Sequence, residues 1–231
     1  MHMMMYWGQL MFQEGGSALM RQVDYFHDYL LFITMFIMFL VLYGLLFFLF
    51  NSSGFRLFND SHITELVWTI FPLFVLFFLA FPSLRLLYLL EEEKDPIINL
   101  KVTGHQWYWN YLYYEFTGID FDSYMLPEET LEFGQFRLLD VDTRLVLPCK
   151  SEIGAVVTGA DVIHSWSLPA LGVKMDGIPG RMNTSTFNSG EVGIYYGQCS
   201  EICGANHSFM PIVMESVPSN HFNKWAQAVM N

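Results

Sequence analysis

Two cysteines, a histidine and a methionine lie within residues 199–210, near the carboxyl end of the chain. Thiolate and thioether sulfurs select copper and other thiophilic metals, and imidazole is an equally good ligand for copper. A loop that carries Cys, His and Met in this order is typical of a mononuclear copper site, which needs one cysteine. Here Cys199 is followed by Cys203, and two thiolates on one tight loop can bridge the same pair of ions. Completed by His207 and Met210, the loop therefore predicts a binuclear metal centre.

Three simpler interpretations stay open when each residue is taken singly. Cys199 and Cys203 could form a disulfide bond. They could bind zinc, although the spacing C-x3-C differs from the usual C-x2-C and a second Cys/His pair is missing. Met210 could be an ordinary core residue. The combination of the four side chains at these offsets favours copper.

A further candidate ligand, His164, lies 35 residues upstream of Cys199. A lone histidine beside apolar residues is more often a core residue than a ligand. In a β sandwich whose metal ligands come from two loops, however, an upstream histidine supplies the remaining ligand. The metal loop therefore makes His164 the expected partner of the two cysteines.

Two long apolar runs precede the region that carries these ligands. The first, residues 29–50, has no charge, and the second, residues 66–90, contains Pro72, Pro82 and a cation, Arg85, near its end. About 20 apolar residues cross a bilayer as a helix. Proline is tolerated in such a helix, and a terminal arginine can reach the interface. We expect a surface arm over 1–24 and a transmembrane hairpin over 25–90, with spans at about 27–50 and 66–90.

The remainder, residues 91–231, has the pattern of a β domain. Short runs separated by turn residues indicate a sandwich or barrel. These runs are 97–102, 136–141, 144–147, 153–157 and 193–196. The spacing of Phe222, Trp225 and Val229 predicts a final helix. The expected fold class is an α+β membrane protein, with a two-helix transmembrane hairpin followed by a β-sandwich or barrel.

The charge of the chain restricts its partners. The formal net charge is −12, and 18 acidic against 8 basic residues from Glu91 onward give the β domain −10 of it. This sign argues against nucleic acid as a partner and suits a basic protein. The three cysteines give no disulfide framework. Cys149 stands in an apolar run and is expected to be a buried small hydrophobe.

Four runs of residues resemble subunit 2 of mitochondrial cytochrome c oxidases. They are 104–109 (GHQWYW), 121–125 (FDSYM), 179–181 (PGR) and 195–204 (YYGQCSEICG). The resemblance implies a cupredoxin-like domain that binds two copper ions in a dinuclear copper A centre. It implies as ligands the terminal imidazoles of His164 and His207, the bridging thiolates of Cys199 and Cys203, the weak axial thioether of Met210 and the backbone carbonyl of Glu201.

The same resemblance implies the electron-transfer subunit of the oxidase, complex IV. Electrons from cytochrome c would enter at Trp107 and pass through the copper centre to the haem of catalytic subunit 1, which reduces O2 and pumps protons. The side chain of Glu201 would bind a Mg²⁺ ion shared with that subunit. Glu65 would be a point of proton uptake. Capping of the second helix through its dipole is an equally good explanation of Glu65.

The resemblance also implies a location in the mitochondrial inner membrane. Both ends of the chain and the copper domain would face the intermembrane space. Three acids are candidates for docking cytochrome c through long-range attraction: Glu115, Asp142 and Asp161. The family often has a second acid beside the equivalent of Asp161, where this chain has Ala160. We therefore expect docking to be weaker or rearranged.

Three other functions compete with this one. A quinol oxidase subunit of the same architecture lacks the copper ligands that this chain has. A membrane-tethered copper-binding protein outside the oxidase has no evident use for the aromatic run 107–114 or for the run 179–181. A soluble reductase with a similar copper centre is opposed by the two apolar runs.

Overall fold

A computed structural model describes residues 2–3, 8–51, 54, 60–92 and 94–230 of the chain. It divides into two compact units. One unit comprises residues 22–90, and the other joins residues 1–21 to residues 91–231. The three segments expected from the sequence, 1–24, 25–90 and 91–231, stay a prediction.

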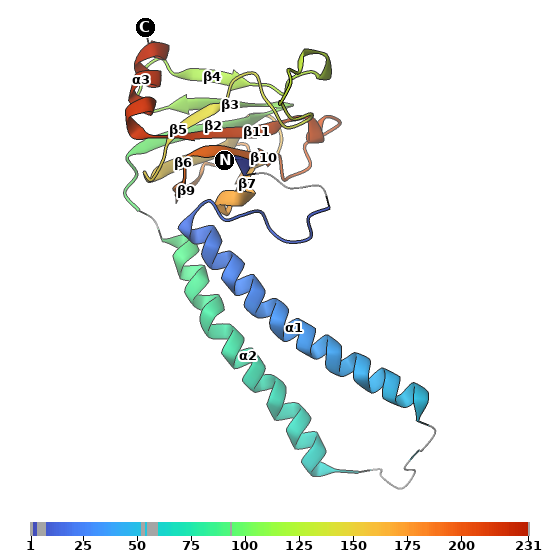
Figure 1. Cartoon of the computed structure of the whole chain (residues 1–231). Coiled ribbons are helices and arrows are strands. Elements are labelled where there is room, and N and C mark those ends of the chain that lie inside the picture. Colours follow the sequence, from blue (N-terminus) through green and yellow to red (C-terminus); the bar gives the residue numbers. More distant parts are fainter. Residues whose placement is uncertain (1, 4–7, 52–53, 55–59, 93, 231) are drawn as a thin grey trace. The chain divides into compact units, whose positions relative to one another are not determined.

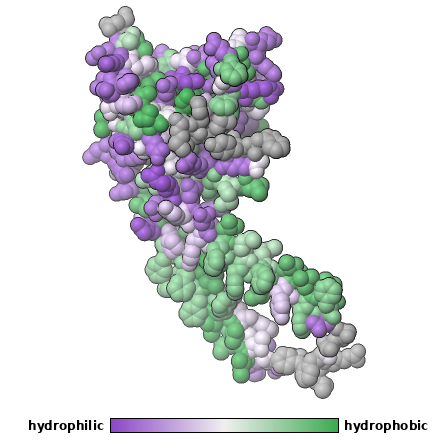
Figure 2. Space-filling model, in the orientation of Figure 1, coloured by the Kyte–Doolittle hydropathy of each residue, from purple (hydrophilic) through white to green (hydrophobic). Residues whose placement is uncertain are grey.

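The helical unit contains most of α1 (Ala18–Phe50) and all but the last residue of α2 (His62–Glu91) (Figure 1). Both helices are long and apolar enough to cross a membrane. Figure 2 shows hydrophobic residues over most of their visible surface. Both begin earlier than the spans expected from hydropathy, at residue 18 instead of about 27 and at residue 62 instead of 66, because each helix includes polar residues that precede its apolar run.

Hydroxyl side chains mark the places where the two helices begin. The Ser17 hydroxyl accepts a hydrogen bond from the N–H of Met20 at 2.9 Å and donates one to the carbonyl of Leu171 at 2.8 Å. The Ser61 hydroxyl accepts from a backbone N–H in the first turn of α2 at 3.4 Å. Serine at these positions satisfies N–H groups that have no partner within the helix. Glu65 lies in the same first turn, where the helix dipole favours an acid.

The other unit is a β domain, in which the described residues form two larger sheets and a two-stranded ribbon (Figure 1). The first sheet has the order β1-β10-β11-β5, the second has the order β4-β3-β2-β6-β9, and β7 pairs with β8. The elements are β1 (His2–Met3), β2 (Ile98–His105), β3 (Tyr108–Tyr113), β4 (Asp120–Ser123), β5 (Leu145–Pro148), β6 (Ile153–Gly159), β7 (His164–Leu168), β8 (Val173–Gly177), β9 (Asn183–Phe187), β10 (Gly193–Gln198), β11 (Pro211–Val217) and α3 (Ser219–Met230).

One hydrophobic core draws side chains from both larger sheets. Buried and half-buried residues alternate along β2 and β3, as expected for strands that cover a core on one face. Leu100 and Tyr111 are fully buried on this face, and Trp166 of β7 joins them. Cys149 is also buried, as the sequence predicted. The strands expected at 97–102, 144–147, 153–157 and 193–196 are confirmed as β2, β5, β6 and β10.

The run 136–141 was expected to be a strand, and this prediction is wrong. The segment forms turns, and Leu138 has a φ of +65°. The Asp140 carboxylate accepts hydrogen bonds from the N–H of Phe136 at 2.6 Å and from the Arg144 guanidinium at 3.3 Å. A short acidic side chain that bonds to nearby backbone offers an alternative to the hydrogen bonds of a sheet. The apolar alternation of the run is outweighed by this local contact.

The predicted final helix is present as α3. Phe222 and Ala226 are buried, and the rings of Phe222 and Trp225 pack against Tyr113 of β3. Val229 is 47% exposed, so the buried face of this helix ends at Ala226, about one turn before the helix itself ends. The helix therefore closes the end of the sheet at which β3 finishes.

A close approach at Gly197 holds β10 against β7. A methyl group on Gly197 would lie 1.8 Å from the carbonyl oxygen of Ser167, so no side chain fits there. Just beyond it, the N–H of Ser200 donates to the carbonyl of Ser165 at 2.9 Å. The start of β7 and the loop that follows β10 are thereby held side by side.

We predict that Tyr113→Phe lowers the free energy of unfolding of the β domain by about 1 kcal/mol, the usual net value of a buried hydrogen bond. The buried Tyr113 hydroxyl donates to the carbonyl of Val146 at 2.6 Å, and the substitution would leave that carbonyl without this donor. Tyr114→Phe is the control, because this neighbour is 50% exposed. Denaturant titration followed by tryptophan fluorescence measures both, and equal midpoints for the two variants would contradict the prediction.

Candidate metal centre

The side chains predicted as metal ligands come from two segments of the β domain. His164 is the first residue of β7, and the others lie on the loop between β10 and β11. The Nδ1 or Nε2 atom of His164 and the sulfur atoms of Cys199 and Cys203 lie within 4.8 Å of one another, and all three residues are buried. The structure therefore brings the upstream histidine to the cysteine pair.

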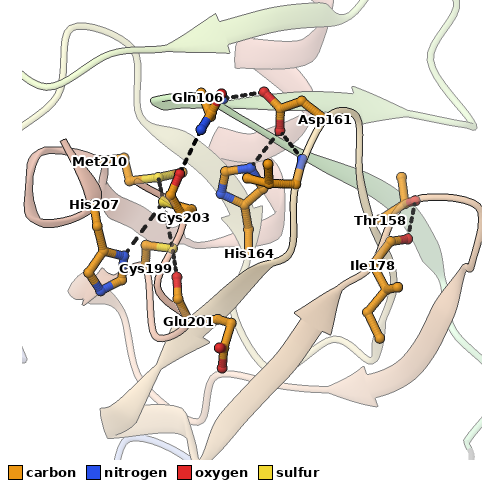
Figure 3. A network of polar contacts seen from close by, with 11 residues as sticks. Gln106, Thr158, Asp161, His164, Ile178, Cys199, Glu201, Cys203, His207 and Met210 are labelled. Carbon is orange, nitrogen blue, oxygen red and sulfur yellow. Dashed lines mark hydrogen bonds and ion pairs between the residues drawn. The ribbon is translucent and has the colours of Figure 1, made fainter. Parts of the chain in front are cut away.

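The remaining predicted ligands surround the two sulfur atoms (Figure 3). The Cys203 sulfur lies 3.6 Å from Nδ1 of His207 and 3.5 Å from the sulfur of Met210. The Cys199 sulfur lies 3.3 Å from the carbonyl oxygen of Glu201. The two cysteine sulfurs are 4.0 Å apart, about twice the length of a disulfide bond. Both cysteines are free thiols in this arrangement.

His164 has the hydrogen bonding expected of a metal ligand. Its Nε2 atom bonds to the Asp161 carboxylate at 2.9 Å. Its Nδ1 atom is buried and has no hydrogen-bond partner among the described residues. Burial by itself would lower the pKa of His164, but the nearby Cys199 sulfur and Asp161 carboxylate raise it overall. A buried nitrogen of this kind needs a partner. A metal ion held by the sulfur atoms would supply one.

Asp161 is fixed by three donors. Its carboxylate accepts from His164 and from the backbone N–H groups of Gln106 at 2.7 Å and Val162 at 2.6 Å. Burial alone would raise the pKa of Asp161, but these hydrogen bonds lower it overall. An ionised carboxylate behind a histidine fixes its ring orientation and tautomer, as is typical of metal sites.

The two thiols differ in acidity. Burial by itself would raise the pKa of Cys199, but the nearby His164 ring and the backbone of Ser165 lower it by more, so the net shift is downward. Burial and the charge of Cys199 both raise the pKa of Cys203. A second thiolate beside the first therefore needs a compensating cation. The donor set of sulfur and imidazole fits a thiophilic metal such as copper.

Gly104 and Trp109, on β2 and β3, form the floor of the site. A methyl group on Gly104 would lie 2.8 Å from the His164 ring, so this position has room only for hydrogen. The Trp109 ring meets that of His164 edge-on, with centroids 5.8 Å apart, and its Nε1 donates to the carbonyl of Met210 at 3.3 Å. Sequence reasoning missed both contacts, although both residues belong to the run GHQWYW.

Gln106 joins the β2–β3 turn to the metal loop, and it was also missed. Its side-chain amide donates to the carbonyl of Cys203 at 2.7 Å. Trp107, the next residue, is half-buried, and its indole packs on Gly204, where a methyl group would lie 3.2 Å from the ring. The Trp107 ring is thus in contact with the residue that follows Cys203.

The three acids predicted to dock a partner lie in different places. Asp161 is beside the site. Asp142 is exposed and accepts from the N–H of Tyr124 at 2.9 Å, and the Tyr124 ring stacks on Tyr108. Glu115 accepts from the backbone and side chain of Asn99, at the other end of the β2–β3 hairpin. Six residues of strand, about 20 Å, separate that end from the turn that carries Trp107.

Two further predicted residues have side chains away from the sulfur atoms. The Glu201 side chain is exposed and lines a polar pocket of about 450 Å³ with Lys174, Asp176 and Arg181. Glu65 lies in the helical unit, where its carboxylate is close to the carboxylate of Asp60 and to the imidazole of His62.

Comparisons with known proteins agree with this description. A family model described as cytochrome c oxidase subunit II, periplasmic domain, matches residues 98–217, and its transmembrane-domain counterpart matches residues 5–86. Curated proteins named cytochrome c oxidase subunit 2 from Drosophila lowei and Drosophila subobscura are each 54% identical over 225 residues, covering 97% of this chain and 98% of theirs. The one from Simulium vittatum is 53% identical and covers 96% and 97%.

Solved structures are similar to the β domain. The crystal structure of the periplasmic domain of cytochrome oxidase subunit II (CoxB) of Bradyrhizobium japonicum has a TM-score of 0.56 and 43% identity. It covers 60% of this chain and 96% of that one. A mixed disulfide intermediate between a thioredoxin-like protein and such a subunit II domain has a TM-score of 0.53 and 42% identity, covering 60% and 94%. These similarities confirm the predicted cupredoxin-like fold.

We predict that Gly104→Ala lowers the metal affinity of the centre by about tenfold or more, the usual effect of disturbing the surroundings of a ligand. The added methyl group would displace the His164 ring. Gly44→Ala is the matched control, because a methyl group there meets nothing within 4 Å. Copper content after reconstitution, measured by atomic absorption, checks both variants. Full copper loading of Gly104→Ala would contradict the role assigned to this glycine.

Proposed function

The chain belongs to the cytochrome c oxidase subunit 2 family, and from this premise we propose that it carries electrons from cytochrome c to the haem of the oxidase's catalytic subunit. The proposed carrier is a dinuclear copper centre on residues 199–210 together with His164. The observation that carries the proposal is the pair of buried thiols 4.0 Å apart, with an imidazole on either side. A binuclear centre accounts for two buried cysteines placed between the buried His164 and the half-buried His207.

In this proposal each ligand has its own part. The ions would be held by the imidazoles of His164 and His207, the thiolates of Cys199 and Cys203, the thioether of Met210 and the backbone carbonyl of Glu201. When bound, such a copper pair takes up and releases one electron that both ions share. Sulfur and imidazole donors suit copper in both oxidation states.

The protein's own residues keep the ligands in place and exclude water. Asp161 orients His164, and the amide of Gln106 holds the carbonyl of Cys203. His164, both cysteines and Met210 are buried. Ligands on a rigid frame move little when charge changes, which is what an electron carrier requires.

We propose Trp107 as the residue at which electrons enter. Its contact with Gly204 supports this role, because the ring then lies one residue from a bridging thiolate. Asp142 contacts Tyr124 and Asp161 contacts His164, so both acids belong to the same side of the domain as Trp107. Together with the negative net charge of the domain, they would attract a basic carrier. Glu115 stays a candidate for docking cytochrome c, which it would attract at long range.

The remaining roles also belong to this proposal. The Glu201 side chain would bind Mg²⁺ at the border with the catalytic subunit, since Mg²⁺ takes few protein carboxylates and keeps waters. Its exposure and its polar surroundings support this role. Glu65 would take up protons for the catalytic subunit. The chain would lie in the mitochondrial inner membrane, with its copper domain and both ends in the intermembrane space.

We predict that the full chain, reconstituted with copper, binds two ions per chain and turns purple. Electron paramagnetic resonance should show one unpaired electron shared over both nuclei, because two thiolates bridge them. Cys203→Ser should abolish this sharing, and Cys149→Ser should preserve it, since Cys149 lies outside the cluster. A single-copper hyperfine pattern in the unmodified protein would refute the binuclear assignment.

We also predict that Trp107→Phe slows reduction of the centre by cytochrome c about tenfold or more, equivalent to about 1.4 kcal/mol in activation free energy. Copper content should not change, because the Trp107 ring contributes no ligand atom. Trp225→Phe, on α3, is the control and should leave the rate unaltered. Stopped-flow absorbance measures the rate, and equal rates for the two variants would exclude Trp107 as the point at which electrons enter.

A further inference from the structure

A groove of about 250 Å³ lies between the first turns of α1 and the last turns of α2, inside the helical unit. Its apolar walls include Phe26 of α1 and Pro82 and Leu86 of α2. Its lining residues with polar groups are Gln22, Tyr25, Tyr29 and Arg85. The groove thus combines an apolar lining with one cation.

Arg85 has no acidic partner in this groove. No ion pair or hydrogen bond to it is present among the described residues. At about 100° per residue, Asp24 and Asp28 of α1 and Glu91 of α2 point more than about 90° away from the groove-lining faces. Asp28 is instead close to His27, at 3.5 Å. The positive charge of Arg85 is therefore uncompensated by the protein on the side that it faces.

The depth of Arg85 defines the chemistry that can compensate it. It lies six residues before the end of α2, about 9 Å along the helix axis. It is also the only charged residue of α2 between Glu65 and Glu91. At this depth below the end of a membrane helix, a guanidinium meets the level of lipid headgroups. Tyrosines at the same end are typical of this interface.

We propose that this groove binds one anionic phospholipid, with its phosphodiester on Arg85 and an acyl chain along Phe26 and Leu86. A guanidinium binds phosphate oxygens through two parallel hydrogen bonds. The tyrosine hydroxyls supply further donors for the phosphate or the glycerol backbone. Cationic grooves between transmembrane helices are suited to anionic headgroups. An anionic lipid is favoured over a zwitterionic one because no carboxylate in the groove would receive a choline or ethanolamine cation.

The test uses the full chain in nonionic detergent with dioleoyl phosphatidylglycerol or dioleoyl phosphatidylcholine, and native mass spectrometry counts the retained lipids. We expect one retained phosphatidylglycerol per chain, bound about fivefold or more tightly than phosphatidylcholine. Arg85→Gln should remove this preference, and Arg85→Lys should keep part of it. Leu86→Trp should weaken the binding of both lipids, because the larger side chain would fill the groove. Arg137→Gln is the control, because this arginine pairs with Glu128 on the β domain at 3.0 Å.

Three results would overturn the proposal. The first is equal retention of the two lipids by the unmodified chain, and the second is retention of the preference by Arg85→Gln. The third is loss of the lipid when the chain is assembled with its catalytic subunit, which would show that protein fills the groove. Millimolar inorganic phosphate should not displace the lipid, and displacement would show a site for the free anion instead. The copper absorbance of each variant reports that the β domain is intact.

Discussion

Two thiols that lie 4.0 Å apart in a buried site cannot both lose their protons unless a positive charge lies beside them. Burial and the charge of Cys199 raise the pKa of Cys203, so the pair by itself retains a proton. A thiophilic cation removes this restriction, and the sulfur atoms in turn give the cation its strongest ligands. The surrounding structure preserves the distances that make the pair a binding site.

The positions of these side chains depend on close backbone contacts between strands more than on the loop itself. Gly104 lets the His164 ring approach β2, and Gly197 lets β10 approach β7. The loop of residues 199–210 has little regular structure, but β10 and β11 at its ends are paired with each other in register. Asp161 and Gln106 then fix one ligand from each segment. The site is therefore rigid because two sheets and a ribbon meet at it.

The cluster of side chains on residues 199–210 and the two long apolar helices could be predicted because the patterns that indicate them are local. Thiolate, imidazole and thioether groups at fixed offsets have few other uses, and an uncharged apolar run of bilayer length has fewer still. Gln106 could not be predicted, because its role depends on a carbonyl 97 positions away. The strand expected at 136–141 failed because the Asp140 carboxylate bonds to nearby backbone. Glu115 was selected by charge, and charge does not reveal that this residue lies at the far end of its hairpin.

Under the proposed function, Asp161 would link recognition of the partner to redox chemistry through a single carboxylate. The residue is exposed, yet its oxygen atoms are already shared by the His164 ring and two backbone N–H groups. A cationic protein that draws on this carboxylate must alter its hold on the imidazole. By thermodynamic reciprocity, the oxidation state of the centre must then alter how tightly that protein is held. Under the proposed function, docking of a cationic carrier and the oxidation state of the centre would thus be thermodynamically coupled through Asp161.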